Sequence, residues 1–178
     1  MIRSAIFASV AALAMMSATT AQAALAVGAK APALSVKGAD AGKQIDYSLA
    51  EALKKGPVVL YFFPKANTGG CDLEAKLFGE ASAEFAAAGV SVVGASKDNV
   101  ETLTKYSTEK CASKFPVVSV DDKAVEAFDV KGMLPVITSR TTYMIAPDST
   151  VLMSFTGAPA DHPVKSLEAV KAWKAKQP

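Results

Sequence analysis

The sequence predicts an α/β layered fold with a mixed central sheet, and two observations support this. Short apolar runs rich in β-branched and aromatic residues alternate with segments of helical spacing along the chain, which is the order expected of an α/β protein. The clearest run, Val58 to Phe63, is apolar throughout, as in a strand buried on both faces. Further along, two alternating runs flank a Pro-Asp turn, which predicts an antiparallel hairpin in the same sheet.

The N-terminal residues are expected to lie outside this fold. A basic start, Met1 to Arg3, precedes an almost wholly apolar run, and Ala21-Gln22-Ala23 is a small-residue cleavage pattern. This combination predicts a secretory signal peptide over residues 1–23. Its apolar run is shorter than the roughly 20 residues of a spanning helix. We therefore expect a periplasmic or secreted protein without a membrane span, with one domain over residues 24–178.

The net charge and the cysteine content indicate which partners and which compartment the protein suits. The formal net charge of the whole chain is +2, and loss of Arg3 with the signal peptide leaves +1 (2 − 1). A nearly neutral chain is not organised to bind nucleic acid or an anionic membrane surface. Two cysteines, Cys71 and Cys111, remain in an exported chain, for which the simplest interpretation is a structural disulfide. A domain of this size does not depend on such a bridge.

Local signals place the elements of the first half. Ser48 and Glu51 have the capping-box spacing, and Gly56 suits the end of a helix. Pro64 ends the buried strand, and Gly89 ends a long segment with helical spacing. The expected elements are a surface lead-in (24–42), a strand (44–47), a helix (49–55), the buried strand (58–63) and one long helix (70–88).

The second half is interpreted in the same way. Asp98 is expected to cap a helix, and Asp161 or His162 to cap a last helix that begins at Pro163. The remaining expected elements are strands (90–94, 115–118), a short helix (121–128), a loop (131–139) and the hairpin strands (140–145, 151–155). This order suits a thioredoxin-like three-layer fold with a central mixed β-sheet.

The residues around Cys71 carry the chemistry. Cys71 opens the long helix, and a helix N-terminus favours a thiolate over a thiol. Thr68 is a natural N-cap whose hydroxyl can also donate a hydrogen bond. Pro64, seven residues before the cysteine, would close one side of the pocket with a ring that lacks an N–H group. Arg140, at the start of the hairpin, is a fixed cation that could stabilise the thiolate and a departing oxygen.

These residues recur at the spacings of a known family. They are Pro64, Thr68 and Cys71 in the order P-x-x-x-T-x-x-C, Glu74 in C-x-x-E-A, Arg140 in R-T-T-Y, and Pro147-Asp148 at the hairpin turn. The chain resembles the peroxiredoxins in them, from about Val27 to Trp173, and is most similar to the Q-type (bacterioferritin-comigratory) branch and its exported relatives.

The resemblance implies a thiol peroxidase. Cys71 would be the peroxidatic nucleophile that attacks a peroxide and becomes a sulfenic acid. Thr68 and Arg140 would hold the peroxide, Pro64 would shield the sulfenic acid, and Glu74 would be the family's acidic residue. Neither a cofactor nor a metal is expected, because one histidine and two distant cysteines make no ligand set.

Cys111 has several interpretations. Some Q-type relatives carry a resolving cysteine in this helix region, which would form a disulfide with Cys71 after local unfolding and then be reduced by a thioredoxin-like dithiol. We expect Cys111 to resolve the sulfenic acid. The alternatives are a small core residue, since Cys111 shares the apolar helix face of Val100 and Leu103, and an enzyme that uses one cysteine. The sequence also leaves monomer and homodimer open.

Two departures from the family pattern bear on the site. Gly69 stands where the family usually has proline, and Asp72 where it has threonine. The charge of Asp72 would oppose a thiolate unless its carboxylate turns to solvent. Two other functions stay open: a thioredoxin-type oxidoreductase, which would want a cysteine in place of Thr68, and a non-catalytic binding domain with a permanent disulfide. His162 is expected on the surface or in a cap.

Overall fold

The computed structural model describes residues 24–177, so the predicted signal peptide lies outside the described residues. Seven strands form one mixed sheet in the order β2-β1-β5-β4-β3-β6-β7. The strands are β1 (Ser35–Asp40), β2 (Lys43–Ser48), β3 (Val58–Phe62), β4 (Ser91–Ser96), β5 (Val117–Ser119), β6 (Thr141–Ile145) and β7 (Val151–Thr156). The helices are α1 (Leu49–Leu53), α2 (Gly69–Glu80), α3 (Ser82–Ala87), α4 (Val100–Glu109), α5 (Asp122–Ala127) and α6 (Asp161–Lys174).

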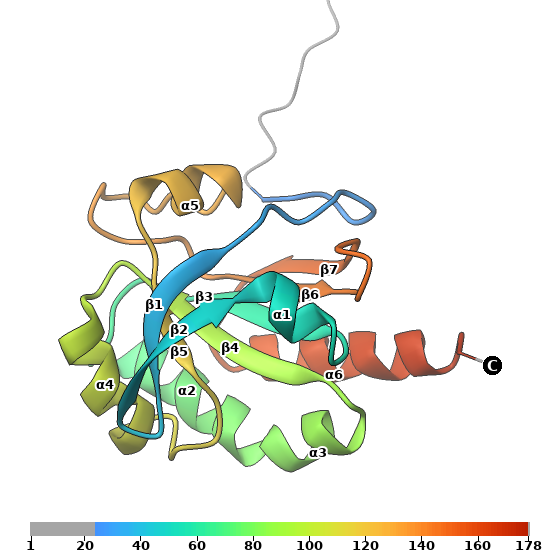
Figure 1. Cartoon of the computed structure of the whole chain (residues 1–178), viewed down its shortest axis with the longest axis horizontal. Coiled ribbons are helices and arrows are strands. Elements are labelled where there is room, and N and C mark those ends of the chain that lie inside the picture. The colour runs from blue at the N-terminus through green and yellow to red at the C-terminus, as the bar shows by residue number, and fades with distance from the viewer. Residues whose placement is uncertain (1–23, 178) are drawn as a thin grey trace, which may run out of the picture.

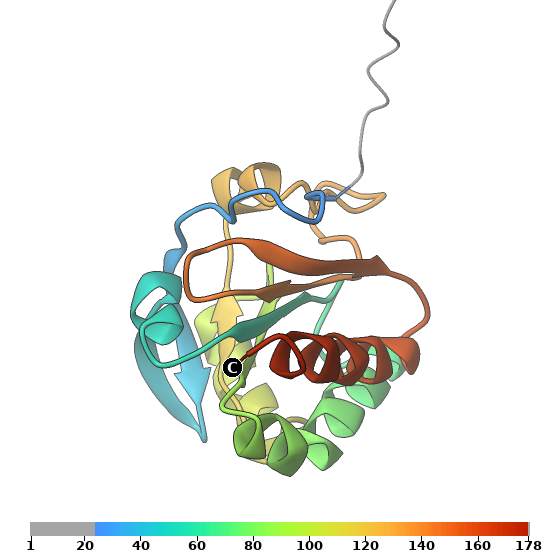
Figure 2. The same ribbon diagram turned by 90° about the vertical axis from the view of Figure 1, so that its right-hand side faces the viewer.

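Helices cover both faces of this sheet, which confirms the three-layer α/β prediction. In Figures 1 and 2, α2, α3 and α6 lie below the sheet, whereas α5 and the segment before β1 lie above it. The buried residues form two clusters, one for each face. The first cluster contains side chains of α2, α3, α4 and α6, and the second contains side chains of α1 and α5.

Strand β3 lies inside the sheet, as its apolar sequence predicts. It pairs in parallel with β4 and antiparallel with β6. Successive side chains of a strand point to opposite faces, so Val59 and Tyr61 join the first cluster while Val58 and Leu60 join the second. The parallel β3–β4 pair and the antiparallel β3–β6 pair together make the sheet mixed.

The prediction of a surface lead-in over residues 24–42 is wrong for its last part. Residues 35–40 form β1, which pairs antiparallel with both β2 and β5. The strand is hard to recognise because it contains small residues where it approaches its neighbour closely. A Cβ atom on Gly38 would lie 2.5 Å from the carbonyl oxygen of Val117. Packing against β5 therefore requires glycine at a position where strands usually have a large apolar residue.

Two helix predictions also change in detail. The expected long helix is two helices, α2 and α3, separated at Ala81, whose ψ of −4° interrupts the helical ladder. The apolar spacing continues through the break because Phe78 and Phe85 are buried in the same cluster. Asn99, and not Asp98, caps α4 by accepting a hydrogen bond from the Thr102 backbone at 2.8 Å.

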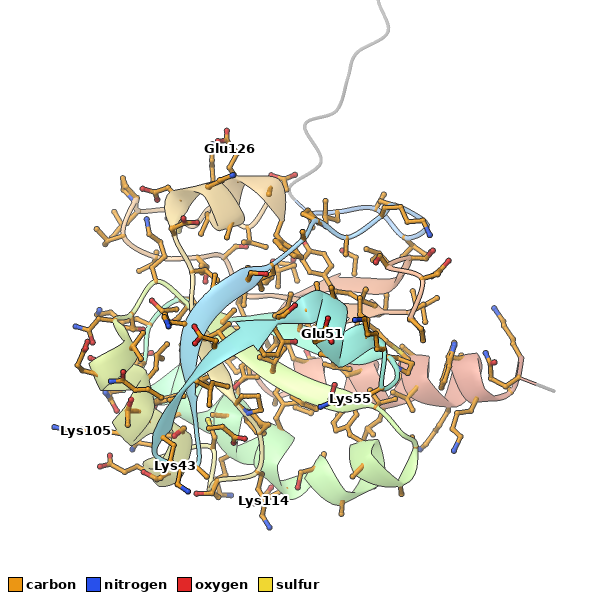
Figure 3. All side chains as sticks on the ribbon, in the orientation of Figure 1. Lys43, Glu51, Lys55, Lys105, Lys114 and Glu126 are labelled. Atoms are coloured by element: carbon orange, nitrogen blue, oxygen red, sulfur yellow. The ribbon has the colours of Figure 1, made fainter. Side chains whose placement is uncertain are left out.

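The other predicted elements are present. The Ser48 side chain accepts a hydrogen bond from the Glu51 backbone at the start of α1, and β6 and β7 form the predicted hairpin. Charged side chains such as Lys105 on α4 and Glu126 on α5 point outward (Figure 3). In the part of the chain that the structure describes, no helix is both long and apolar enough to cross a membrane.

Candidate active site

Cys71 lies in the first turn of α2, just beyond the loop that follows β3. Thr68 occupies the N-cap position with extended backbone angles (φ −120°, ψ 142°), so Cys71 is the third residue of the helix. Its side chain is buried, with 1% of its surface exposed. The peptide dipoles of a helix give its first turn a partial positive charge. An anionic sulfur at this position would therefore be stabilised by the helix itself.

Arg140 reaches the sulfur from the neighbouring strand. It directly precedes β6, which pairs with β3 so that Thr141 lies opposite Phe62. The Arg140 side chain donates from Nη2 to the Cys71 sulfur at 3.3 Å and from Nη1 to Glu74 Oε2. The predicted cation is thus in contact with the predicted nucleophile.

Gly70 leaves room for this contact. A Cβ atom added to Gly70 would lie 3.3 Å from Nη2 of Arg140 and 3.3 Å from the ring of Pro159. Both distances are shorter than an ordinary van der Waals contact. The small residue before Cys71 therefore allows the guanidinium group to lie against the first turn of α2.

Glu74 lies one helical turn after Cys71 and is fully buried. Residues three apart share a helix face, so the carboxyl group lies beside the cysteine and the arginine. Burial raises the pKa of Glu74 to about 8, although the charge of Arg140 acts to lower it. Its Oε1 atom has no hydrogen-bond partner among the described residues.

Thr68 and Pro64 belong to the loop between β3 and α2. The Thr68 hydroxyl does not cap the helix: it donates to the Lys65 carbonyl oxygen at 2.8 Å. Because a carbonyl can only accept, the hydroxyl proton is already used, and the exposed oxygen is left as an acceptor. Pro64 is half-buried directly after Phe63, whose carbonyl oxygen accepts a hydrogen bond from Thr138.

Asp98 anchors the same loop, a role that the sequence analysis missed. Its buried carboxylate accepts hydrogen bonds from the Ala66 backbone at 2.7 Å and from Ser96 at 2.9 Å, and pairs with Lys65 at 3.0 Å. An aspartate before a helix resembles a cap, and no local pattern indicates a partner 32 residues away. Asp98 therefore holds the loop that leads into Cys71.

Asp72 turns away from the sulfur, but toward α4 rather than solvent. One of its oxygens pairs with Lys110 at 3.0 Å, and the side chain is only a quarter exposed. Its other oxygen is buried without a hydrogen-bond partner among the described residues. The carboxylate is thus partly neutralised by a lysine at the end of α4.

Cys111 is also fully buried, two residues beyond the last residue of α4. Both cysteines are free thiols in one apolar cluster. Burial raises the pKa of Cys111 to about 12, with a further increase from Asp72 and a decrease from the Tyr61 hydroxyl. In this conformation Cys111 is a poor nucleophile, because the thiolate and not the thiol is reactive.

His162 is buried, so the expectation of a surface or capping residue is wrong. Ala160 occupies the N-cap position of α6, and the His162 ring lies 2.7 Å from Thr142 Oγ1 and 3.5 Å from Glu74 Oε1. A histidine beside proline at a helix start gives no sequence signal for such partners. Within residues 24–177, no group of three or more His, Cys, Asp and Glu side chains could hold a metal ion.

A thioredoxin-like sheet, with a cysteine at a helix N-terminus that an arginine contacts, defines a thiol-based oxidoreductase. Comparison with known proteins shows which family of thiol-based oxidoreductases this is. The chain belongs to the AhpC/TSA family, whose model matches residues 27–154, and it is a peroxiredoxin-type thiol peroxidase.

Named relatives point to the Bcp, or Q-type, branch. The chain is 30% identical over 152 residues to peroxiredoxin Bcp of Bacillus subtilis, which covers 82% of this chain and 94% of that protein. It is 33% identical over 125 residues to peroxiredoxin Bcp of Xanthomonas campestris, covering 65% of this chain and 76% of that protein.

Solved structures agree with this assignment. Peroxidoxin BcpB of Mycobacterium tuberculosis has a TM-score of 0.72 at 30% identity, covering 82% of this chain and 96% of that one. A mutant of Xylella fastidiosa PrxQ has a TM-score of 0.71 at 28% identity, covering 84% of this chain and 98% of that one. The thioredoxin-like fold predicted from the sequence is confirmed.

Proposed function

We propose that this protein reduces hydrogen peroxide or alkyl hydroperoxides with Cys71 as its peroxidatic cysteine. The observation that carries the proposal is the 3.3 Å contact between Arg140 Nη2 and the Cys71 sulfur in a buried site. The sulfur anion would attack the O–O bond and become a sulfenic acid. The departing oxygen would take up one proton and leave as water or an alcohol.

The neighbouring residues have distinct parts in this proposal. Arg140 would stabilise both the sulfur anion and the negative charge that develops on the departing oxygen. Thr68, whose proton is engaged by Lys65, would accept a hydrogen bond from the peroxide O–H group. Glu74 would hold Arg140 in place, and Pro64 would restrict access to the sulfenic acid.

Cys111 is proposed as the resolving cysteine. Its thiol would attack the Cys71 sulfenic acid, so that an S–S bond forms and water leaves. Because Cys111 is buried, the end of α4 must first unfold. Ala112 and Ser113 favour this opening, since their φ angles of 49° and 55° are left-handed and cost roughly 1–2 kcal/mol each for such residues.

The physiological reductant and the compartment complete the proposal. A thioredoxin-like dithiol would reduce the Cys71–Cys111 disulfide, and the predicted signal peptide would bring the enzyme to the periplasm or outside the cell. Expression of the full chain in a bacterium with mass measurement of the periplasmic fraction tests the location. A mature protein beginning at Ala24 would support export, whereas an uncleaved protein confined to the cytoplasm would contradict it.

The function itself is tested with peroxide consumption by reduced protein. Cys71→Ser should abolish it. Cys111→Ser should allow one turnover and then stall with a thioredoxin-like reductant. Reduction of insulin disulfides without peroxide consumption would favour a thioredoxin-type oxidoreductase instead. A Cys71–Cys111 disulfide that resists dithiols, with neither activity, would favour a binding domain.

A further inference from the structure

His162 connects α6 to the peroxidatic site through Glu74. Its ring is fully buried, with Phe155 against it at 4.8 Å between ring centres. Nε2 lies 3.2 Å from the Gly157 carbonyl oxygen, and Nδ1 lies 2.7 Å from the Thr142 hydroxyl. Nδ1 also faces Glu74 Oε1 at 3.5 Å. The ring is therefore held on both nitrogens.

The protonation of the ring follows from these partners. A carbonyl oxygen can only accept, so Nε2 carries the hydrogen. Burial lowers the pKa of His162 to about 4, and the ring is neutral at neutral pH. Nδ1 then presents a lone pair that accepts from Thr142.

A proton on Glu74 Oε1 removes the repulsion between Oε1 and Nδ1, because the hydrogen can then share the Nδ1 lone pair that Thr142 Oγ1 approaches at 2.7 Å. With its pKa raised to about 8, Glu74 is protonated at neutral pH, so Oε1–H can point to Nδ1 while Oε2 accepts from Arg140. A neutral Glu74 also leaves the charge of Arg140 for the cysteine sulfur. An ionised Glu74 would instead place two lone-pair atoms opposite each other, and a buried oxygen without a partner is costly.

We propose that His162 is a positioning residue of the peroxidatic site: its imidazole fixes Oε1 of Glu74, and the fixed carboxyl group orients the Arg140 guanidinium toward the Cys71 sulfur. The path runs from α6 through α2 to the residue before β6, over contacts of 3.5 Å at one end and 3.3 Å at the other. This role rests on the proposed function of Cys71 and concerns the peroxide-reducing step alone.

Two substitutions separate positioning from simple anchoring of α6. His162→Asn keeps a polar atom near the Nδ1 position, facing Glu74 and Thr142, and loses the contact with Gly157. His162→Gln does the reverse. The second-order rate constant of the first turnover with hydrogen peroxide is measured by rapid mixing, and disulfide formation is measured separately.

Positioning predicts a clear order of rates. His162→Gln should lower the peroxide rate constant about tenfold, because small displacements of catalytic groups are expensive. His162→Asn should stay within about threefold of wild type, and disulfide formation should be unchanged in both variants. The opposite order, or equal rates for both variants and wild type, would overturn the proposal. Failure of the wild type to consume peroxide would instead refute the proposed function.

A double-mutant cycle tests the path. If His162 acts through Glu74, adding His162→Gln to Glu74→Met, which has neither the Oε1 hydrogen nor the Oε2 acceptor, should reduce the rate constant less than about twofold further, since residues on one path are not additive. Losses that multiply would overturn the proposal. If thermal unfolding shows that the His162 variants are not folded, Thr142→Val is the alternative. It removes the hydroxyl that contacts Nδ1 and keeps a side chain of similar shape. It should slow the same step, and an unchanged rate would contradict the role.

Discussion

At the scale of single residues, the site is a cluster of ionisable side chains that are largely buried from solvent. One guanidinium group faces two acidic groups, the Cys71 sulfur and Glu74. Desolvation disfavours the charged form of buried acids and histidines, and it acts in this direction on both Glu74 and His162. The proposed chemistry depends on keeping Arg140 against the sulfur while its neighbours stay neutral.

Gly70 provides a test of how tightly Arg140 is held. Gly70→Ala places a Cβ 3.3 Å from the guanidinium, and we expect the first-turnover rate constant to fall about three- to tenfold, because the group must shift by a few tenths of an ångström. Gly69→Ala is the matched control, since no described atom lies within 4 Å of its added Cβ. Equal rate constants for the two variants, measured by stopped flow, would contradict the expectation.

His162 also predicts an acid dependence of stability. Its pKa falls from 6.5 to about 4 on folding, so between these values the unfolded chain binds a proton that the folded chain does not. Stability should therefore be lost as pH falls from 6.5 to 4, by on the order of 3 kcal/mol for this residue. A variant without this histidine should therefore lose less unfolding free energy over the same pH range.

Urea unfolding at pH 7 and pH 4.5 measures the effect. The free energy of unfolding of His162→Gln should fall less than that of wild type between the two pH values. Glu74 titrates with the opposite sign, because its pKa is raised, so the comparison is made with Glu74→Gln present in both proteins. An identical fall in both proteins would show that His162 does not cause the acid loss.

At the scale of elements, the two cysteines lie at the ends of two helices, and in the proposed mechanism the end of α4 must unfold before they react. Cys71 lies at the start of α2 and Cys111 just beyond α4, and the Asp72–Lys110 ion pair joins these two ends. Among the described ion pairs, no other joins α2 to α4 or its end. The pair therefore opposes the opening that would bring Cys111 to the sulfenic acid.

Asp72→Asn should accelerate disulfide formation. The pair is partly exposed, and loss of such a pair changes an opening equilibrium by about two- to fivefold. The rate of disulfide formation after a single peroxide addition is followed by mass spectrometry of quenched samples, and the peroxide step is measured separately. Glu80→Gln, which breaks the Lys76–Glu80 pair within α2, is the control, and equal acceleration by both variants would refute a specific effect.

At the scale of the whole molecule, the sheet brings the site together. Antiparallel pairing of β6 with β3 carries Arg140 to the end of the strand that leads to Cys71. The helix α6 returns across the same face (Figure 2) and delivers His162. Strand β1 is inserted beside β5 and extends the sheet to β2. Close packing at this seam is therefore part of the architecture.

Gly38→Ala tests the seam. The added Cβ would lie 2.5 Å from the Val117 carbonyl oxygen and 2.8 Å from a Val118 methyl group. Because backbone cannot yield easily, we expect unfolding free energy to fall by about 1–3 kcal/mol. Urea unfolding measures this, with Gly69→Ala again as the unstrained comparison. A change below about 0.5 kcal/mol, typical of a surface substitution, would contradict the close approach.

The local features of this protein can be predicted from its residues alone. Val58 to Phe62 forms a buried strand because its side chains are apolar on both faces, and Ser48 caps α1 because its partner is three residues away. The spacing of Pro64, Thr68 and Cys71 likewise identified the loop and the helix start. Such signals act over a few residues, so they survive in the sequence without knowledge of the fold.

The directions of the remaining polar side chains depend on contacts between distant segments. His162 is buried because Glu74 and Thr142 meet it from other elements, Asp98 turns to the loop before Cys71, and Asp72 turns to Lys110. Strand β1 was not predicted, because its close contact with β5 requires a glycine that interrupts the apolar pattern of a strand. A buried polar group is stable only with partners, and these partners come from segments far apart in the sequence.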